Sequence, residues 1–250
     1  MSLFARRNAT QSLLNWVFLV TISLSLADAT PSSIYPYSFE TTIDALYQTI
    51  EFNNSPPSYE AFNRALNGYY KLKNANLISP KEILTIIDYK RSANEKRLWV
   101  IDLKNKKVLF HTLTAHGRNS GDEHAQFFSN TRNSNQSSLG FYITGNTYIG
   151  KHGTSLKLHG VEPGINDNAE ARAIVMHGAK YVSESHIKKY GRLGRSFGCP
   201  AVPVELHAAL INALANKTCL FIYYPDPIYF AQSTFKSEND GPVQRSNWWR

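Results

Sequence analysis

The sequence contains little sulfur, with two cysteines and two methionines among 250 residues. Cys199 and Cys219 lie much farther apart than the C-x-x-C spacing of redox pairs, which disfavours a redox thiol protein. Cys219 belongs to the apolar stretch TCLFIYYP, which predicts a buried strand in which the thiol acts as a small apolar side chain. A structural disulfide between the two cysteines is the alternative that the sequence leaves open.

Metal and nucleotide motifs are also missing. The eight histidines form neither an H-E-x-x-H nor an H-x-H pattern, which disfavours a zinc peptidase. The stretch GNTYIGKH (145–152) approaches a phosphate-binding loop, but His152 replaces the hydroxyl residue that would bind magnesium. This stretch also lies between predicted strands, so we interpret it as a hairpin turn and expect no metal in the site.

Only one long apolar stretch is present, and it lies at the N-terminus. Arg6 and Arg7 precede the apolar run 13–26, and the Ala-Asp-Ala stretch at 27–29 has the form of a signal-peptidase site. The run is shorter than the roughly 20 residues that cross a bilayer. We predict a cleaved signal peptide over residues 1–29, with a membrane anchor as the alternative. The mature protein is then exported to the periplasm or cell wall without a membrane span.

Acidic residues are fewer than basic ones, 19 against 27, which gives a formal net charge of +8. A basic surface favours polyanionic partners. Because the Lys and Arg residues are scattered and the predicted signal exports the protein, we expect no nucleic acid partner. A carboxylate-rich wall polymer fits both observations, and an ordinary solvated basic surface explains the charge equally well.

The first part of the mature chain, residues 30–90, is predicted to be helical. Apolar residues recur three and four positions apart in the stretches 41–52 and 59–74. A third helix is predicted for SPKEILTIIDY (79–89), because its serine, proline and glutamate form a capping-box pattern.

After residue 91 the pattern changes to short strands separated by Gly, Asn and Ser. The predicted strands are 97–103, 106–115, 139–150, 155–161, 171–179 and 219–225, with one helix over 204–217. We predict a mainly β fold with peripheral helices, a β-sandwich or barrel-like body over residues 91–230. A polar, flexible tail is predicted over 231–250.

The stretch GRSFGCP (194–200) makes Cys199 a candidate nucleophile. Gly198 allows a tight turn, so the backbone N–H groups of Gly198 and Cys199 can point to one spot beside the sulfur and hold an oxyanion. A reactive thiol needs a neighbouring imidazole. His177 ends the apolar run 173–176, which predicts a strand buried on both faces. We therefore predict that His177 is the base that serves Cys199, with His159 as the alternative base.

The stretches MHGA and GRSFGCP together resemble the catalytic signature of murein L,D-transpeptidases of the YkuD type, in which a His-Gly pair precedes Ser-x-Gly-Cys. The chain is most similar to the YkuD-like 2 subgroup, the murein L,D-transpeptidase catalytic domain family. Further matching stretches are RLWVIDL, TAHGRNSG, FFSN, SSLGFYIT, SLKLHGVEPGINDNAEARAIVMHGA and GRLGRSFGCPAVP, so the similarity spans residues 83–224. It implies a YkuD-like β-sandwich or barrel-like catalytic domain, no metal and no diffusible cofactor.

The chain departs from the family pattern beside the cysteine. Better-known members carry histidine where Phe197 stands, and Pro200 and Ala201 also differ from the residues that those members carry. The side chains with which those members bind the terminal carboxylate of their peptide substrate are therefore not present here. We expect Arg195 to bind this carboxylate, since a guanidinium binds a carboxylate through two parallel hydrogen bonds. The other predicted substrate contacts are Ser196, Phe197, His159 and Tyr142.

The remaining histidines have structural interpretations. His116, in TAHGRNSG, is expected to organise a loop beside the site, and His152 to lie in a turn. His207 is expected on a solvent-exposed helix face.

The resemblance implies a two-step acyl transfer on peptidoglycan. Cys199 attacks a carbonyl of a stem tetrapeptide, D-alanine leaves with a proton from His177, and the amine of a second stem resolves the thioester. If water resolves it instead, the protein is an L,D-carboxypeptidase. A non-catalytic cell-wall-binding protein of the same fold is a further alternative. We expect a monomer whose partners are peptidoglycan stem peptides.

Overall fold

The structure is a computed structural model that describes residues 39–236. The predicted signal peptide and the tail from residue 237 onward lie outside these residues. The described strands are β1 (Ile83–Asp88), β2 (Leu98–Asp102), β3 (Lys107–Thr112), β4 (Gly140–Gly150), β5 (Gly153–Gly160), β6 (Val175–Gly178), β7 (Ala201–Val202) and β8 (Cys219–Tyr223). The described helices are α1 (Phe39–Thr49), α2 (Tyr59–Asn74), α3 (Glu184–Tyr190), α4 (Val204–Leu214) and α5 (Pro227–Gln232). Within this part of the chain, no helix has the length and apolar character needed to cross a membrane.

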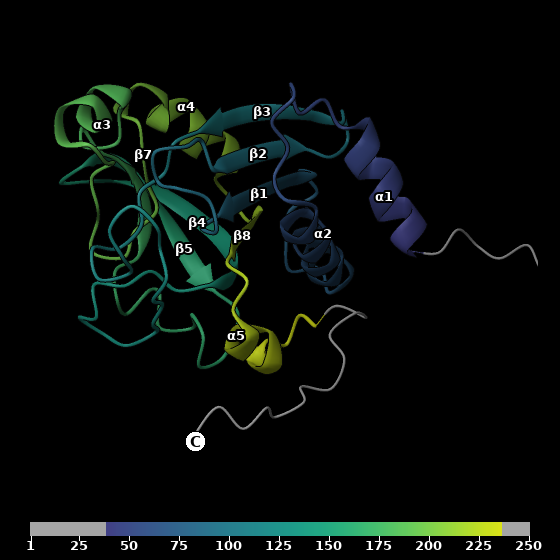
Figure 1. Ribbon diagram of the computed structural model, residues 1–250. Helices are drawn as coiled ribbons and strands as arrows, with labels where there is room; N and C mark the ends of the chain where they lie inside the picture. The colour runs from purple at the N-terminus through teal and green to yellow at the C-terminus, as the bar shows by residue number, and fades with distance from the viewer. Residues whose placement is uncertain (1–38, 237–250) are drawn as a thin grey trace, which may run out of the picture. The chain divides into compact units, whose positions relative to one another are not determined.

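The strands form one sheet in the order β3-β2-β1-β8-β4-β5-β6-β7 (Figure 1). Its two ends are joined by the chain that leaves β3. In this segment Ala115 N–H donates to the Ala201 carbonyl of β7 at 2.9 Å, and Thr114 Oγ1 donates to the same oxygen at 3.0 Å. The sheet is therefore nearly closed, and the predicted mainly β, barrel-like fold is confirmed.

The helix predicted over residues 79–89 is wrong, because most of this stretch forms β1. Leu84, Ile86 and Ile87 are fully buried, and the strand lies between β2 and β8. An apolar run of this length fits a strand covered on both faces as well as a helix, and its β-branched residues favour the strand. The β body therefore begins well before the predicted boundary at residue 91.

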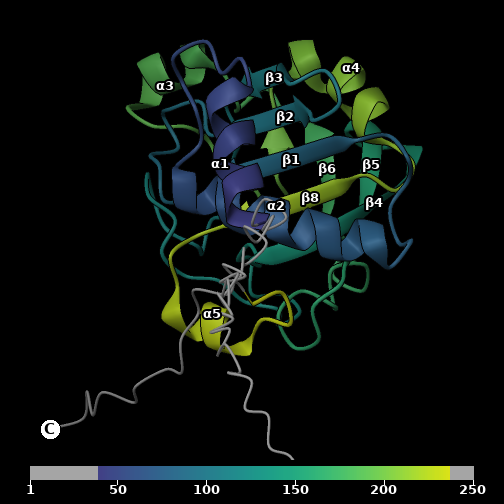
Figure 2. The same cartoon turned by 90° about the vertical axis from the view of Figure 1, so that its right-hand side faces the viewer.

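The two earlier helices form as predicted, and α2 braces the sheet. Its buried face includes Phe62, Leu66 and Tyr69, and it packs on β1 and β8 (Figure 2). A Cβ at Gly68 would lie 2.0 Å from the ring of Phe141, so glycine allows the helix to approach β4 closely. The helical segment therefore covers part of the core.

The C-terminal end of the described chain is ordered farther than the predicted tail boundary at residue 231. Asp226 caps the short helix α5 by accepting from Ile228 N–H at 2.7 Å. Beyond it, the buried Ser233 donates to the Glu162 carboxylate, which also accepts from Tyr229 Oη at 3.1 Å. These contacts fasten residues up to 233 to the β body.

Candidate active site

The loop around Cys199 is held in one conformation by its own side chains. Ser196 Oγ accepts from Gly198 N–H at 3.1 Å and donates to the Cys199 carbonyl at 2.6 Å. Gly198 has φ 125°, and a Cβ there would lie 2.8 Å from the Gln136 carbonyl oxygen. Only glycine fits this position without strain, because side chains disfavour positive φ. The loop is also tied to its surroundings, since Ser196 N–H donates to the His116 carbonyl at 2.9 Å.

The sheet register places Cys199 beside β6. β6 and β7 are parallel, with His177 opposite Ala201, so Cys199 runs alongside Val175 two residues earlier. Val175 N–H accordingly donates to Cys199 Sγ at 3.5 Å. Cys199, Val175 and His177 all line one cavity of about 460 Å³.

The prediction that residues 173–176 are buried on both faces is wrong. Ile174 and Met176 point into the core, whereas Ala173 is exposed and Val175 is half-buried at the cavity. Side chains alternate between the two faces of a strand, so His177 lies on the same face as Val175. The apolar run thus has one core face and one cavity face.

His177 is buried, and its ring has one nitrogen occupied. Nδ1 lies 3.0 Å from the Gly178 carbonyl oxygen. A neutral imidazole that donates its proton there leaves Nε2 with a free lone pair, as a general base requires. The His152 ring stacks on it, with centroids 4.2 Å apart and planes at 17°. Burial lowers the pKa of His177 below 6.5, and the nearby His152 and Lys151 lower it further, against the raising effect of the Gly178 carbonyl.

Burial raises the pKa of the Cys199 thiol, although Val175 N–H, Arg172 and Lys151 oppose this effect. The raised thiol pKa and the lowered pKa of His177 both favour neutral forms. The resting pair is therefore a thiol and a neutral imidazole. In the described residues the two side chains share the cavity without a direct hydrogen bond.

Arg172 also lines the cavity, and sequence reasoning missed it. Its guanidinium donates to the Ser129 carbonyl at 2.6 Å and the Gln136 carbonyl at 2.5 Å, and it lowers the pKa of Cys199. The residue lies in the EARAIVMHGA stretch, but strand alternation would place it on the face of Ile174, away from the cysteine. Ala173, with φ 54°, breaks that alternation, and nothing in the sequence predicts a left-handed alanine.

Three other predicted residues lie at this cavity or its loop. Arg195 lines the cavity, but its guanidinium is 3.1 Å from the Asp122 carboxylate and donates to the Gly121 carbonyl at 2.9 Å. Phe197 also lines it and is 64% exposed, with the Arg118 guanidinium 4.7 Å from its ring centroid. Ser196 is buried and acts within the loop.

Two predicted substrate contacts are not at this cavity. Tyr142 is fully buried, and its hydroxyl donates to the Ser138 carbonyl at 3.0 Å. His159 lines a second cavity, formed by β4 and β5. His207 also differs from its predicted place on a solvent-exposed helix face. Its ring packs against β6, where a Cβ at Gly178 would lie 2.8 Å from it.

The other histidines behave nearly as predicted. His116 is buried in its loop, where its Nδ1 lies 2.8 Å from the Arg97 guanidinium. His152 lies in the turn between β4 and β5 and also lines the cavity beside Cys199. Both cysteines are free thiols, so the alternative of a disulfide is wrong. Residues 39–236 contain no group of three or more His, Cys, Asp or Glu side chains arranged to hold a metal ion.

Comparison with known families gives one match that spans most of the chain. Residues 53–223 match the YkuD_2 profile, described as the L,D-transpeptidase catalytic domain. The matched range includes α2 and β1 and thus starts before the predicted domain boundary. No curated protein sequence matches the chain significantly.

Solved structures give more distant similarities. An L,D-transpeptidase from Mycobacterium smegmatis is 10% identical with a TM-score of 0.37, covering 57% of this chain and 59% of its own. The helical cell shape determining protein Pgp2 from Campylobacter jejuni is 12% identical with a TM-score of 0.34, covering 58% and 45%. An L,D-transpeptidase from Stackebrandtia nassauensis is 11% identical with a TM-score of 0.35, covering 75% and 78%. The match thus covers less than two thirds of the length of the first two proteins.

Proposed function

The chain belongs to the L,D-transpeptidase catalytic domain family, and from this premise we propose that it is a cysteine-dependent peptidoglycan L,D-transpeptidase. The observation that carries the proposal is the single cavity of about 460 Å³ that both Cys199 and His177 line. A thiol and an imidazole on neighbouring strand ends are the pair that nucleophilic acyl transfer needs.

The first step forms a thioester with a stem tetrapeptide. Cys199 Sγ attacks the scissile carbonyl carbon while its proton passes to Nε2 of His177, and the carbonyl electron pair moves to oxygen. Collapse of this tetrahedral intermediate breaks the C–N bond, and the proton on His177 goes to the departing amine of D-alanine. Because the resting pair is neutral, the proton moves only when a substrate is attacked.

The charge on the tetrahedral oxygen needs donors. We assign this role to the Cys199 N–H within the positive field of Arg172 and Lys151, which both act on the thiol. The predicted second donor, Gly198 N–H, is bonded to Ser196 Oγ. Gly198 therefore contributes by shaping the loop, and it donates to the oxyanion only if Ser196 Oγ releases it.

Substrate contacts are assigned to the residues at the cavity mouth. Arg195 binds the substrate's terminal carboxylate, which replaces the Asp122 carboxylate as its partner. The Asp122 side chain is 72% exposed, so water can solvate it once it is displaced. Phe197, exposed beside the cavity, packs on the peptide. Peptidoglycan as the substrate also places the protein outside the cytoplasm, as the predicted signal peptide requires.

The thioester is then resolved by an acceptor. A side-chain amine of a second stem gives a cross-link, with His177 as the base that accepts its proton. Water as the acceptor gives the trimmed tripeptide, which is the L,D-carboxypeptidase reaction.

The test uses purified protein and disaccharide-tetrapeptide, followed by mass spectrometry beside a Cys199→Ala control. We expect loss of one D-alanine that depends on Cys199, and the product distinguishes cross-linking from trimming. A His177→Ala variant should also be inactive while remaining folded. If the unmodified protein leaves the substrate intact but binds it as well as Cys199→Ala does, the non-catalytic wall-binding alternative replaces this proposal.

A further inference from the structure

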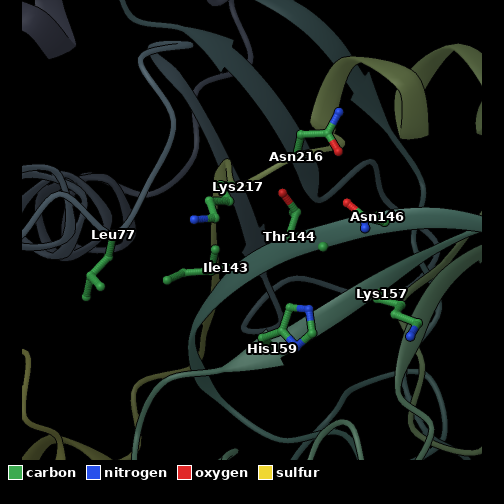
Figure 3. Close-up of a pocket in the computed structure, with 9 residues that line it drawn as sticks. Leu77, Ile143, Thr144, Asn146, Lys157, His159, Asn216 and Lys217 are labelled. Atoms are coloured by element: carbon green, nitrogen blue, oxygen red, sulfur yellow. The ribbon is translucent and has the colours of Figure 1, made fainter.

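A second cavity, of about 520 Å³, is lined by residues of the paired strands β4 and β5 and does not include the cysteine. Figure 3 shows the side chains that reach it from β4, from β5, from the turn before β8 and from the segment before β1. The residues that line this cavity include Ile143, Asn146, Lys157, His159, Asn216 and Lys217. Among the described lining residues there are two lysines and a histidine, and no aspartate or glutamate.

This cavity lies on the same face of the sheet as the catalytic cavity. Leu156 and Leu158 point into the core, so Ser155, Lys157 and His159 share the opposite face of β5. Ser155 lines the catalytic cavity and is opposite His177. One face of β5 therefore runs from the catalytic cavity into the second one.

The register gives the distance between the two cavities. Lys157 is opposite Val175, which lines the catalytic cavity. Along β5, Lys157 lies about 7 Å and His159 about 13 Å from Ser155, since a strand advances about 3.4 Å per residue. An extended peptide covers similar distances in two to four residues.

The local backbone is built to keep this cavity open. β4 carries an extra residue between Thr144 and Thr147, so Gly145 and Asn146 together oppose Lys157. Bulges of this kind redirect side chains next to sites. A Cβ at Gly145 would lie 2.5 Å from His159 Nε2, so the glycine leaves room for the imidazole.

The turn before β8 is fixed to the same bulge. Asn216 N–H donates to the Gly145 carbonyl at 3.1 Å, and Lys217 N–H donates to the Thr144 carbonyl at 2.8 Å. Asn216 and Lys217 have φ 70° and 64°, and two consecutive left-handed residues are costly where neither is glycine. Lys157 of β5 and Lys217 of the turn before β8 thus line the cavity from the two sides of β4.

One carboxylate of the protein already contacts this cluster. Glu170 lies 3.5 Å from His159 Nδ1 and 4.0 Å from Lys157 Nζ, with a side chain that is 66% exposed. Exposed pairs at these distances are weak. A ligand carboxylate can therefore replace Glu170 while the apolar Ile143 contacts the ligand's aliphatic part.

We propose that the cavity lined by Lys157, His159 and Lys217 binds a carboxylate of the peptide whose scissile carbonyl sits at Cys199. This carboxylate lies within two residues of that carbonyl in the tetrapeptide, a span of about 7 Å, which corresponds to the position of Lys157 along β5. The inference rests on the proposed function for the identity of the peptide, and it adds a specificity site for acidic peptide substrates.

The test measures binding of disaccharide-tetrapeptide by calorimetry, using the full chain with Cys199→Ala so that no turnover occurs. The double substitution Lys157→Met and Lys217→Met should weaken binding about tenfold, because two charged contacts are lost. The matched control removes two exposed lysines elsewhere, Lys104→Met and Lys188→Met, and should retain the affinity. Glu170→Gln should change affinity in the opposite direction, tightening binding about threefold, because it removes the competing carboxylate.

A second ligand identifies the group that is bound. The same peptide with only its non-terminal carboxylates amidated, so that the terminal carboxylate assigned to Arg195 is kept, should bind the unmodified cavity about tenfold more weakly, and the double lysine substitution should not weaken it further. Raising the salt concentration should weaken binding of the acidic peptide more in the unmodified cavity than in the double variant.

The outcomes separate this inference from the proposed function. Turnover that depends on Cys199, with equal affinity in the double variant and its control, overturns the inference alone. Binding that depends on the lysines without any turnover overturns the proposed function and retains the carboxylate site. Absence of both binding and turnover overturns both.

Discussion

At the scale of single residues, the proposed acyl transfer starts from a cysteine and a histidine that are both neutral. Burial raises the pKa of Cys199 and lowers that of His177, so neither carries a charge near pH 7. The cavity therefore does not hold the thiolate–imidazolium pair that activates many cysteine enzymes. Attack must be coupled to proton transfer, and this has consequences for the pH dependence.

We expect kcat/KM for D-alanine release to show a broad plateau around neutral pH. Activity needs neutral His177, whose lowered pKa places the acid limb below pH 6.5, and a protonated thiol, whose raised pKa places the alkaline limb above pH 9. The profile is measured with the tetrapeptide substrate. Activity that rises only above pH 9, as expected for a reaction that needs a preformed Cys199 thiolate, would contradict the neutral pair.

Arg172 is expected to tune the thiol, because its charge lowers the pKa of Cys199. Replacing it with methionine should raise that pKa further and slow alkylation by iodoacetamide at pH 7 about tenfold. Arg172→Lys, which keeps the charge but loses the fork of donors, should recover part of the rate. Because Cys219 is fully buried, the alkylation reports on Cys199. Equal rates in the two variants would mean that Arg172 acts through its loop contacts alone.

At the scale of elements, the site depends on how loops and strand ends meet. The Cys199 loop contacts the chain after β3 through Ser196, and it lies beside β6 through the register of β7. At Gly198 the loop also passes close to the backbone of Gln136, so that a Cβ there would lie 2.8 Å from the Gln136 carbonyl oxygen.

Gly198→Ala should therefore reduce activity more than tenfold and lower the free energy of unfolding by about 1–3 kcal/mol. The added methyl meets a carbonyl oxygen at 2.8 Å, and φ 125° disfavours any side chain. Gly164→Ala is the matched control, because its φ is also positive, at 76°, but no atom lies within 4 Å of the added Cβ. The control should lose some stability and keep its activity. Equal activity in both variants would contradict a role for this loop geometry.

The elements also show what a sequence can predict. A strand with one core face, such as β5, alternates apolar and polar residues and is predictable. β1 is not, because it is covered on both faces, so its apolar run has no period that distinguishes strand from helix. The short helix α5 was missed because it has only six residues.

The site was predictable to a similar extent. Cys199 and His177 carry a recognisable pattern, and they line one cavity. Arg172 reaches that cavity only because Ala173 takes a left-handed conformation, and Tyr142 is excluded from it because the phenol points into the core. Both outcomes depend on tertiary packing, which local patterns do not encode.

At the scale of the whole molecule, buried polar groups make stability depend on pH. Arg97 is fully buried and donates to the Thr114 carbonyl at 3.0 Å. Its guanidinium also faces Nδ1 of His116, which must therefore accept and be neutral. Burial, together with Arg97, lowers the pKa of His116 to about 3.

The free energy of unfolding should consequently fall as pH drops below 6.5. The unfolded chain takes up a proton at His116 below that pH, whereas the folded chain does not until about pH 3. This one group contributes a slope of up to about 1.4 kcal/mol per pH unit. Urea unfolding at pH 7 and pH 5 measures it, and His116→Gln should flatten the dependence. His124→Gln, at a side chain that is 56% exposed, is the control and should leave the slope unchanged. An unchanged slope in His116→Gln would contradict the assignment.

The position of β8 in the sheet means that the sheet can be completed only late in synthesis. β8 is the last strand to be synthesised, yet it lies between β1 and β4 and is the only described strand that joins β3-β2-β1 to β4-β5-β6-β7. Until residue 223 has left the ribosome, the two half-sheets share no strand, and long-range pairing of this kind is slow. The Cys199 loop is held by bonds to both halves, through His116 from the first and Val175 from the second. The sheet that carries the Cys199 loop is therefore complete only after β8 has been synthesised, and the proposed acyl transfer depends on that complete sheet.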